Sequence, residues 1–82
     1  MNVAKRRQNE KEFKNWTKTS SGGRQYWFIV TGRNGGSARY VKDVDRDETT
    51  IAFRQEVFDI HGTMLEIHEK FPIDKGHVKI VQ

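Results

Sequence analysis

Histidines and lysines in the second half of the chain are the residues best suited to acid–base chemistry. His68 and Lys70 are two residues apart, and His77 follows shortly after them. Cleavage of a phosphodiester bond without a metal needs a base, an acid and a cation for the phosphate, and imidazole and ammonium groups can fill these roles. His68, His77 and Lys70 are therefore the candidate catalytic residues of one possible function, a small metal-independent ribonuclease of toxin type. A histidine that merely titrates on the surface is the alternative reading.

The sequence matches no metal-binding pattern. There is no cysteine, and the spacing of the three histidines fits no zinc motif. Residues 43–47 alternate acidic side chains like the start of a calcium loop, but Glu48 stands where that loop needs glycine and Arg54 where it needs glutamate. We expect neither a metal nor a cofactor.

The elements that must position these side chains follow from local patterns. Residues 3–16 are rich in helix formers and contain no glycine or proline, which predicts a helix, and residues 19–23 read as a flexible connector. Segments rich in β-branched and aromatic residues then alternate with turn residues. The predicted strands are 24–31, 37–44, 50–60, 63–71 and 77–81, with turns at Asn34-Gly35, His61-Gly62 and 72–76.

Length and hydrophobicity indicate one core. A chain of 82 residues is too short for several domains, and its large apolar residues cluster between Tyr26 and Val81. We expect a single domain over 1–82, in which 1–23 form a basic N-terminal helix and connector and 24–82 an antiparallel sheet. The predicted fold class is α+β, an N-terminal helix packed on one face of a four- to five-stranded antiparallel β-meander.

Turn positions predict strand register, and register decides which side chains share a face. Centring the first hairpin on Asn34-Gly35 places Phe28 opposite Val41 and Trp27 opposite Lys42. The later predicted pairs are Tyr40 with Gln55, Gln55 with His68, and Phe58 with Leu65. One face then forms the core, covered by Phe13 and Trp16, and consists of Tyr26, Phe28, Val30, Val41, Ala52, Phe58, Ile60, Leu65, Ile67 and Phe71.

The other predicted face mixes aromatic and cationic side chains. Nucleobases stack on aromatic rings while lysines meet phosphates, so this mixture predicts a module that binds RNA or single-stranded DNA. A basic arm on the helix would extend the contact electrostatically. The predicted binding residues are Trp27, Tyr40, Lys42, Phe53, His68 and Lys70, with Lys5, Arg6 and Arg7 in the arm.

A protein-interaction or homodimerisation module without catalytic activity is the alternative. One short helix cannot cover both faces of a sheet, so a partner could bury the second face. Residues 1–42 carry ten Lys/Arg and two Asp/Glu, whereas residues 43–82 carry five and nine. This asymmetry fits either a polyanionic partner or neutralisation of one half by the other.

Composition also predicts a location. No apolar segment is long enough to cross a bilayer, and the first fifteen residues are charged where an export signal is apolar. The missing cysteines agree with a reducing compartment. We expect a cytoplasmic protein that does not engage a membrane.

Overall fold

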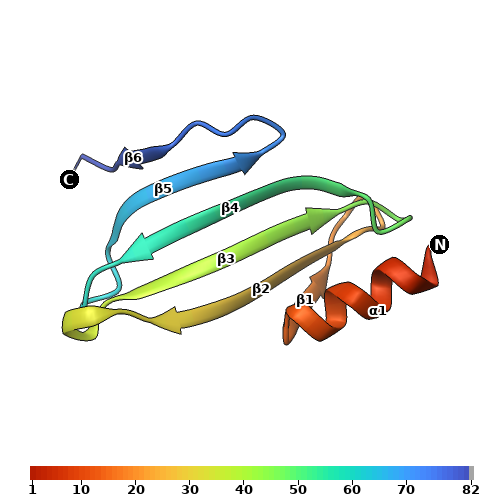
Figure 1. Ribbon diagram of the computed structural model, residues 1–82, viewed down its shortest axis with the longest axis horizontal. Helices are drawn as coiled ribbons and strands as arrows, with labels where there is room; N and C mark the ends of the chain where they lie inside the picture. Colours follow the sequence, from red (N-terminus) through yellow and green to blue (C-terminus); the bar gives the residue numbers. More distant parts are fainter. Residues whose placement is uncertain (82) are drawn as a thin grey trace.

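The computed structural model describes residues 1–81, apart from the side chain of Arg33. One helix, α1 (Val3–Glu12), precedes a six-stranded antiparallel sheet whose strands follow chain order. The strands are β1 (Asn15–Lys18), β2 (Arg24–Thr31), β3 (Ser37–Val44), β4 (Thr50–Phe58), β5 (Met64–Phe71) and β6 (His77–Lys79), and a 3-10 turn, η1 (Arg33–Gly35), joins β2 to β3 (Figure 1). The predicted fold class is confirmed, with one or two more strands than expected.

The first strand is the main departure from the predicted elements. α1 begins at its N-cap Asn2, whose side chain accepts a hydrogen bond from the Lys5 amide at 3.0 Å, and it ends where Phe13 turns to an extended backbone. Trp16 therefore lies in β1 and not in the helix. Residues 19–23 are a tight turn, closed by the Thr19 amide on the Gly23 carbonyl at 3.1 Å. The predicted connector is thus a hairpin, and the sheet begins at Asn15.

Two later hairpins share one turn design. In Asp45–Thr49 and Asp59–Thr63, the amide of the first residue donates to the carbonyl of the last, and the aspartate side chain accepts from two amides inside the turn. The fourth position has a positive φ in both turns, 82° at Gly62 and 64° at Glu48. Glycine adopts this conformation freely, whereas Glu48 is strained there.

The register of β2 against β3 differs from the prediction by one residue. Phe28 lies opposite Tyr40, and Trp27 lies opposite Val41. Asn34 and Gly35 do have the positive φ values expected of them, but the loop holds three residues between Gly32 and Gly36 and not two. Because side chains alternate between faces, this one-residue change moves Trp27 to the other side of the sheet.

The later registers were predicted correctly away from the turns. Tyr40 lies opposite Gln55, and Gln55 lies opposite His68. Each of these hairpins also has a three-residue loop, but a β-bulge next to the loop shifts the pairing back by one residue. Near the turn the prediction was wrong, because Phe58 lies opposite Met64 and not Leu65.

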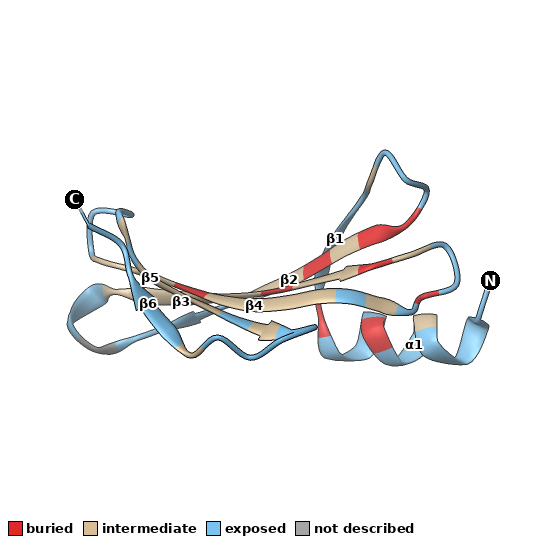
Figure 2. Ribbon diagram, turned by 90° about the horizontal axis from the view of Figure 1, so that it is seen from above, coloured by how far each residue is buried: buried red, intermediate tan, exposed pale blue. Residues whose placement is uncertain are grey.

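The sheet therefore has two unlike faces. We call the side that carries α1 the helix face, and its residues include Tyr26, Phe28, Tyr40, Lys42, Phe53, Gln55, His68 and Lys70. We call the other side the open face, and its residues include Trp27, Ile29, Arg39, Val41, Arg54, Glu56 and Ile67. Seen edge-on, α1 lies on one side of the sheet, and no other described helix lies on the opposite side (Figure 2).

The core is small and lies under α1. Phe13 is 4% exposed and packs its ring against Tyr26, Phe28 and Phe53 at 5.9, 5.3 and 6.4 Å between centroids. Val44 completes the buried cluster. The predicted core face was wrong, because Val41 and Ile67 lie on the open face and α1 covers the side predicted to bind nucleic acid.

Candidate nucleic-acid interface

One row of side chains crosses the helix face from strand to strand. Cross-strand pairing places Phe28, Tyr40, Gln55, His68 and His77 directly opposite one another on β2 to β6. Phe28 and Tyr40 are stacked with centroids 4.9 Å apart, and the Gln55 amide donates to the Tyr40 hydroxyl at 3.1 Å. The row therefore runs from aromatic rings near α1 to imidazoles at the far edge of the sheet.

Cations lie over the aromatic end of this row. Lys70 Nζ is 5.4 Å from the centre of the Tyr40 ring and 5.8 Å from that of Phe53. These distances are within the range of cation–π attraction. Lys42 Nζ lies nearer the helix, where it donates to Asn9 Oδ1 at 2.8 Å. Two half-buried rings and two ammonium groups thus share one region of the helix face.

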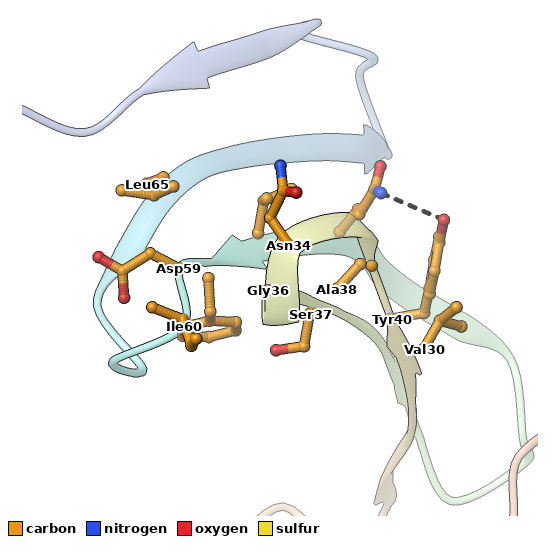
Figure 3. Close-up of a pocket in the computed structure, with 13 residues that line it drawn as sticks. Val30, Asn34, Gly36, Ser37, Ala38, Tyr40, Asp59, Ile60 and Leu65 are labelled. Atoms are coloured by element: carbon orange, nitrogen blue, oxygen red, sulfur yellow. Dashed lines mark hydrogen bonds between the residues drawn. The ribbon is translucent and has the colours of Figure 1, made fainter.

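A hollow of about 500 Å³ opens beside the row, near the turns that join β2 to β3 and β4 to β5 (Figure 3). Tyr40 and Gln55 supply part of its polar lining, with their hydrogen bond visible in the figure, and Asn34, Ser37 and Asp59 supply the rest. Apolar side chains of Val30, Ala38, Val57 and Leu65 supply much of the remaining wall. A flat heterocycle with polar edges matches this combination of an aromatic ring, an amide and aliphatic walls.

The imidazoles at the far edge form a cluster with one carboxylate. The rings of His68 and His77 are 4.5 Å apart, and His68 Nε2 is 2.6 Å from Asp74 Oδ1 in the loop between β5 and β6. The Gly76 amide also donates to Asp74 Oδ1, at 2.9 Å. This amide and the His68 contact lower the pKa of Asp74 below its usual value of 3.8. Asp74 is therefore an anion at neutral pH, and its Oδ1 accepts a hydrogen bond from the Nε2–H group of His68.

Five predicted binding residues share the helix face, and one does not. Tyr40, Lys42, Phe53, His68 and Lys70 lie together there, as the register of β3 to β5 requires. Trp27 lies on the open face, because its cross-strand partner is Val41. The prediction that the rings of Trp27, Tyr40 and His68 point the same way is wrong.

The predicted basic arm lies along α1. Arg6 Nη2 is 3.6 Å from Glu48 Oε2, so this side chain contributes to docking the helix. Lys5 lines a small hollow together with Lys42, which places it at the border of the helix face. Arg7 is exposed.

Two residues of the site were absent from the predicted site residues. Asp74 was not among the predicted catalytic or binding residues, yet it pairs with His68 from the loop between β5 and β6. Its spacing, six residues after a histidine and two before a glycine, is the only signal in the sequence. Gln55 was placed on the correct face, but its bond to the Tyr40 hydroxyl follows only from the observed register.

No group of three or more histidine, aspartate or glutamate side chains in the described part of the chain has the geometry to hold a metal ion. Nor is any helix in residues 1–81 long and apolar enough to cross a bilayer. No family model, curated protein or solved structure matches this chain.

Proposed function

We propose that this protein binds single-stranded nucleic acid, RNA or DNA, across the helix face. The observation that carries the proposal is the row Phe28, Tyr40, Gln55, His68 and His77, with Lys70 over the ring of Tyr40. Stacking on rings is tolerant of base identity, and a neighbouring ammonium group attracts the phosphate. The row supplies both along one line.

Position on the sheet supports the same function. Asn9 of α1 and Phe13 at the end of the helix contact residues of β2, β3 and β4. By contrast, His68, Lys70 and His77 lie on β5 and β6, away from the helix. A strand laid along the row from β6 would reach Tyr40 before it met α1. The hollow beside Tyr40 and Gln55 would accept one base.

Titration of labelled single-stranded oligonucleotides with Tyr40→Ala and Lys70→Ala variants tests the proposal. Loss of one stacked ring weakens binding by about 1–3 kcal/mol, or roughly 5- to 150-fold. Loss of Lys70 should weaken binding. It should also reduce the slope of log affinity against log salt concentration by the contribution of about one phosphate contact. Both effects should be similar for different sequences.

Two matched variants serve as controls. Trp27→Ala removes a ring from the open face, and Lys75→Ala removes a lysine whose Nζ pairs with Glu69 at 3.0 Å. We expect both to bind within about twofold of the unmodified protein. Equal losses for Tyr40→Ala and Trp27→Ala, or no binding at low salt, would contradict the proposal.

A second candidate function, homodimerisation through the open face, is favoured by a separate observation. Among the described residues, the hydrophobic side chains less than a tenth exposed are Phe13, Tyr26, Val41 and Val44. The open face leaves Ile29 61% exposed and Val78 49% exposed. With principal extents of 40 × 24 × 20 Å, the molecule offers a broad face comparable with the ~800 Å² that each partner buries in a standard interface.

A second copy is the occupant that this candidate specifies, and sedimentation tests it. We expect a dimer whose population rises with protein concentration. Ile29→Arg should weaken this dimer, because association would bury the charged arginine side chain away from water. Val3→Arg, which alters an exposed residue of α1 on the other side of the molecule, should leave the dimer intact. A strict monomer at high concentration would exclude this candidate and leave nucleic-acid binding unaffected.

A further inference from the structure

α1 is held against the sheet by polar side chains. Its apolar residues, Val3 and Ala4, are both exposed, and Asn9 is the one buried residue among Val3–Glu12. The helix is joined to the sheet and its turns as follows: Asn9 Oδ1 accepts from Lys42 Nζ at 2.8 Å, Arg6 Nη2 lies 3.6 Å from Glu48 Oε2, and Glu10 Oε2 accepts from Arg24 Nη1 at 3.0 Å. Partly exposed ion pairs stabilise little, and a short helix is marginal in water without apolar packing. α1 is therefore weakly docked.

The apolar core does not include a residue of α1. The buried cluster consists of Phe13, Tyr26 and Val44, with Phe28, Tyr40 and Phe53 packed against it. Phe13 follows the helix as its C-cap with an extended backbone, so its ring belongs to the segment that leads into β1. α1 can therefore leave the sheet while Phe13 stays in place.

Lys42 lies beneath α1 in a second row of side chains on the helix face. Cross-strand pairing places Tyr26, Lys42 and Phe53 opposite one another on β2, β3 and β4, beside the row that starts at Phe28. The second row again combines aromatic rings with a lysine, but Asn9 of the helix holds this lysine. The docked helix therefore occupies a cation that the proposed interface would use.

We propose that α1 is an autoinhibitory cover, which a bound nucleic-acid strand displaces from the helix face. This role rests on the proposed function, because the displacing ligand is the strand bound along the first row. Displacement releases Lys42 from Asn9 and Arg6 from Glu48, so two more cations reach phosphates. A ligand shifts an equilibrium only by its differential affinity for the two states, and these cations provide that difference. The docked helix therefore lowers the affinity of the protein for the strand.

Hydrogen exchange of the backbone amides, measured with and without a short single-stranded DNA, follows the docking of α1 directly. A short helical segment that is released into water loses its helix, so its amides lose protection from exchange. We expect the amides of α1 to exchange faster than those of β3 in the free protein, and faster again when DNA is bound. The amides of β5 should not exchange faster on binding, which separates release of α1 from general unfolding.

Variants of Asn9 test whether docking opposes binding. Asn9→Ala removes the contact with Lys42 and should tighten DNA binding by up to about fivefold, the factor by which one ordinary hydrogen bond shifts an equilibrium. Asn9→Asp places a carboxylate beside Lys42 Nζ, so it should strengthen docking, neutralise the lysine and weaken binding. A merely structural role of Asn9 predicts weaker binding by Asn9→Ala as well. Thermal unfolding checks that both variants fold.

Gln8→Ala is the matched neutral control. The Gln8 amide donates to Glu12 of the same helix at 2.7 Å, and this variant should bind like the unmodified protein. Asn9→Ala that binds no more tightly than the unmodified protein, or α1 amides whose exchange DNA slows, overturns this inference and leaves the binding proposal standing. Absence of binding by all of these proteins overturns the two together.

Discussion

At the scale of single residues, the most informative contact is the one between Tyr26 and Glu48. Tyr26 is fully buried, its hydroxyl donates to Glu48 Oε1, and Glu48 is 2% exposed. Burial, followed by the hydrogen bond with Glu48, raises the pKa of Tyr26 above 10.0. The phenol is therefore a stable donor, and it explains why a glutamate occupies the strained fourth position of the turn.

Glu48→Gly tests this explanation. Glycine relieves backbone strain of about 1 kcal/mol but leaves a buried hydroxyl without its acceptor, which costs about 1–3 kcal/mol. We expect a net loss in the free energy of unfolding, measured by chemical denaturation. Adding Tyr26→Phe should restore the part of this loss that comes from the unpaired hydroxyl, because phenylalanine needs no acceptor, but not the part that comes from the lost Arg6–Glu48 pair. A double variant no more stable than Glu48→Gly would refute the explanation.

Ion pairs on the open face predict that the stability of the folded protein depends on pH. Glu56 is 4% exposed, and it accepts from Arg39 Nε at 2.6 Å and from Arg54 Nε at 2.9 Å. Burial alone would raise the pKa of Glu56, but the two arginines outweigh it and lower the pKa below 4.5. The folded state thus holds fewer protons than the unfolded state, and the resulting stability is present above pH 4.5 and lost as the pH falls through the folded pKa.

Glu56→Gln should therefore lose stability at pH 7 and approach the unmodified protein in strong acid. Denaturation at pH 7, 5 and 3 measures the difference between the two proteins, which we expect to shrink toward the lowest pH. A difference that stays constant with pH would mean that Glu56 stabilises the sheet by packing alone.

At the scale of elements, the closeness of two turns explains the role of Gly23. A Cβ on Gly23 would lie 1.9 Å from the Val44 carbonyl oxygen, so the turn after β1 packs directly against the backbone at the end of β3. A Cβ on Gly62 would meet nothing within 4 Å, and only its φ of 82° opposes substitution.

Gly23→Ala and Gly62→Ala form a matched pair that tests this packing. Gly62→Ala should lower the free energy of unfolding by about 1–2 kcal/mol, the strain of a left-handed alanine. Gly23→Ala should lower it by more, about 3 kcal/mol or beyond, because backbone must move. Thermal or chemical denaturation gives both values, and equal losses would contradict the close approach.

The strands were largely predictable from the sequence, but the face of the sheet on which each side chain lies was not. The β-branched and aromatic content of 24–31 and 37–44 is a local property, and both strands appear with the predicted bounds. Which face a side chain lies on depends on the loop length together with any β-bulge. A bulge follows the loop between β3 and β4 and between β4 and β5, but none follows the loop between β2 and β3. The same limit applies to the site: Tyr40 and His68 were placed together, whereas Trp27 was placed on the wrong side.

At the scale of the whole molecule, the opposite charges of the two halves are partly used internally. Arg6 pairs with Glu48, and Arg39 pairs with Glu56, so basic residues of the first half meet acidic residues of the second. No ion pair of Lys42 or Lys70 appears among the described salt bridges. No described ion pair therefore neutralises these two lysines of the helix face, as the proposed binding of a polyanion requires, whereas Arg39 and Arg54 of the open face pair with acidic residues.

Side-chain chemical shifts during titration with a short single-stranded oligonucleotide test the central claim most directly. The account predicts that the aromatic signals of Tyr40, Phe53 and His68 move together and saturate, while the indole of Trp27 on the open face stays unchanged. Movement of the Trp27 signals without those of Tyr40, or no movement of either at low salt, would contradict it.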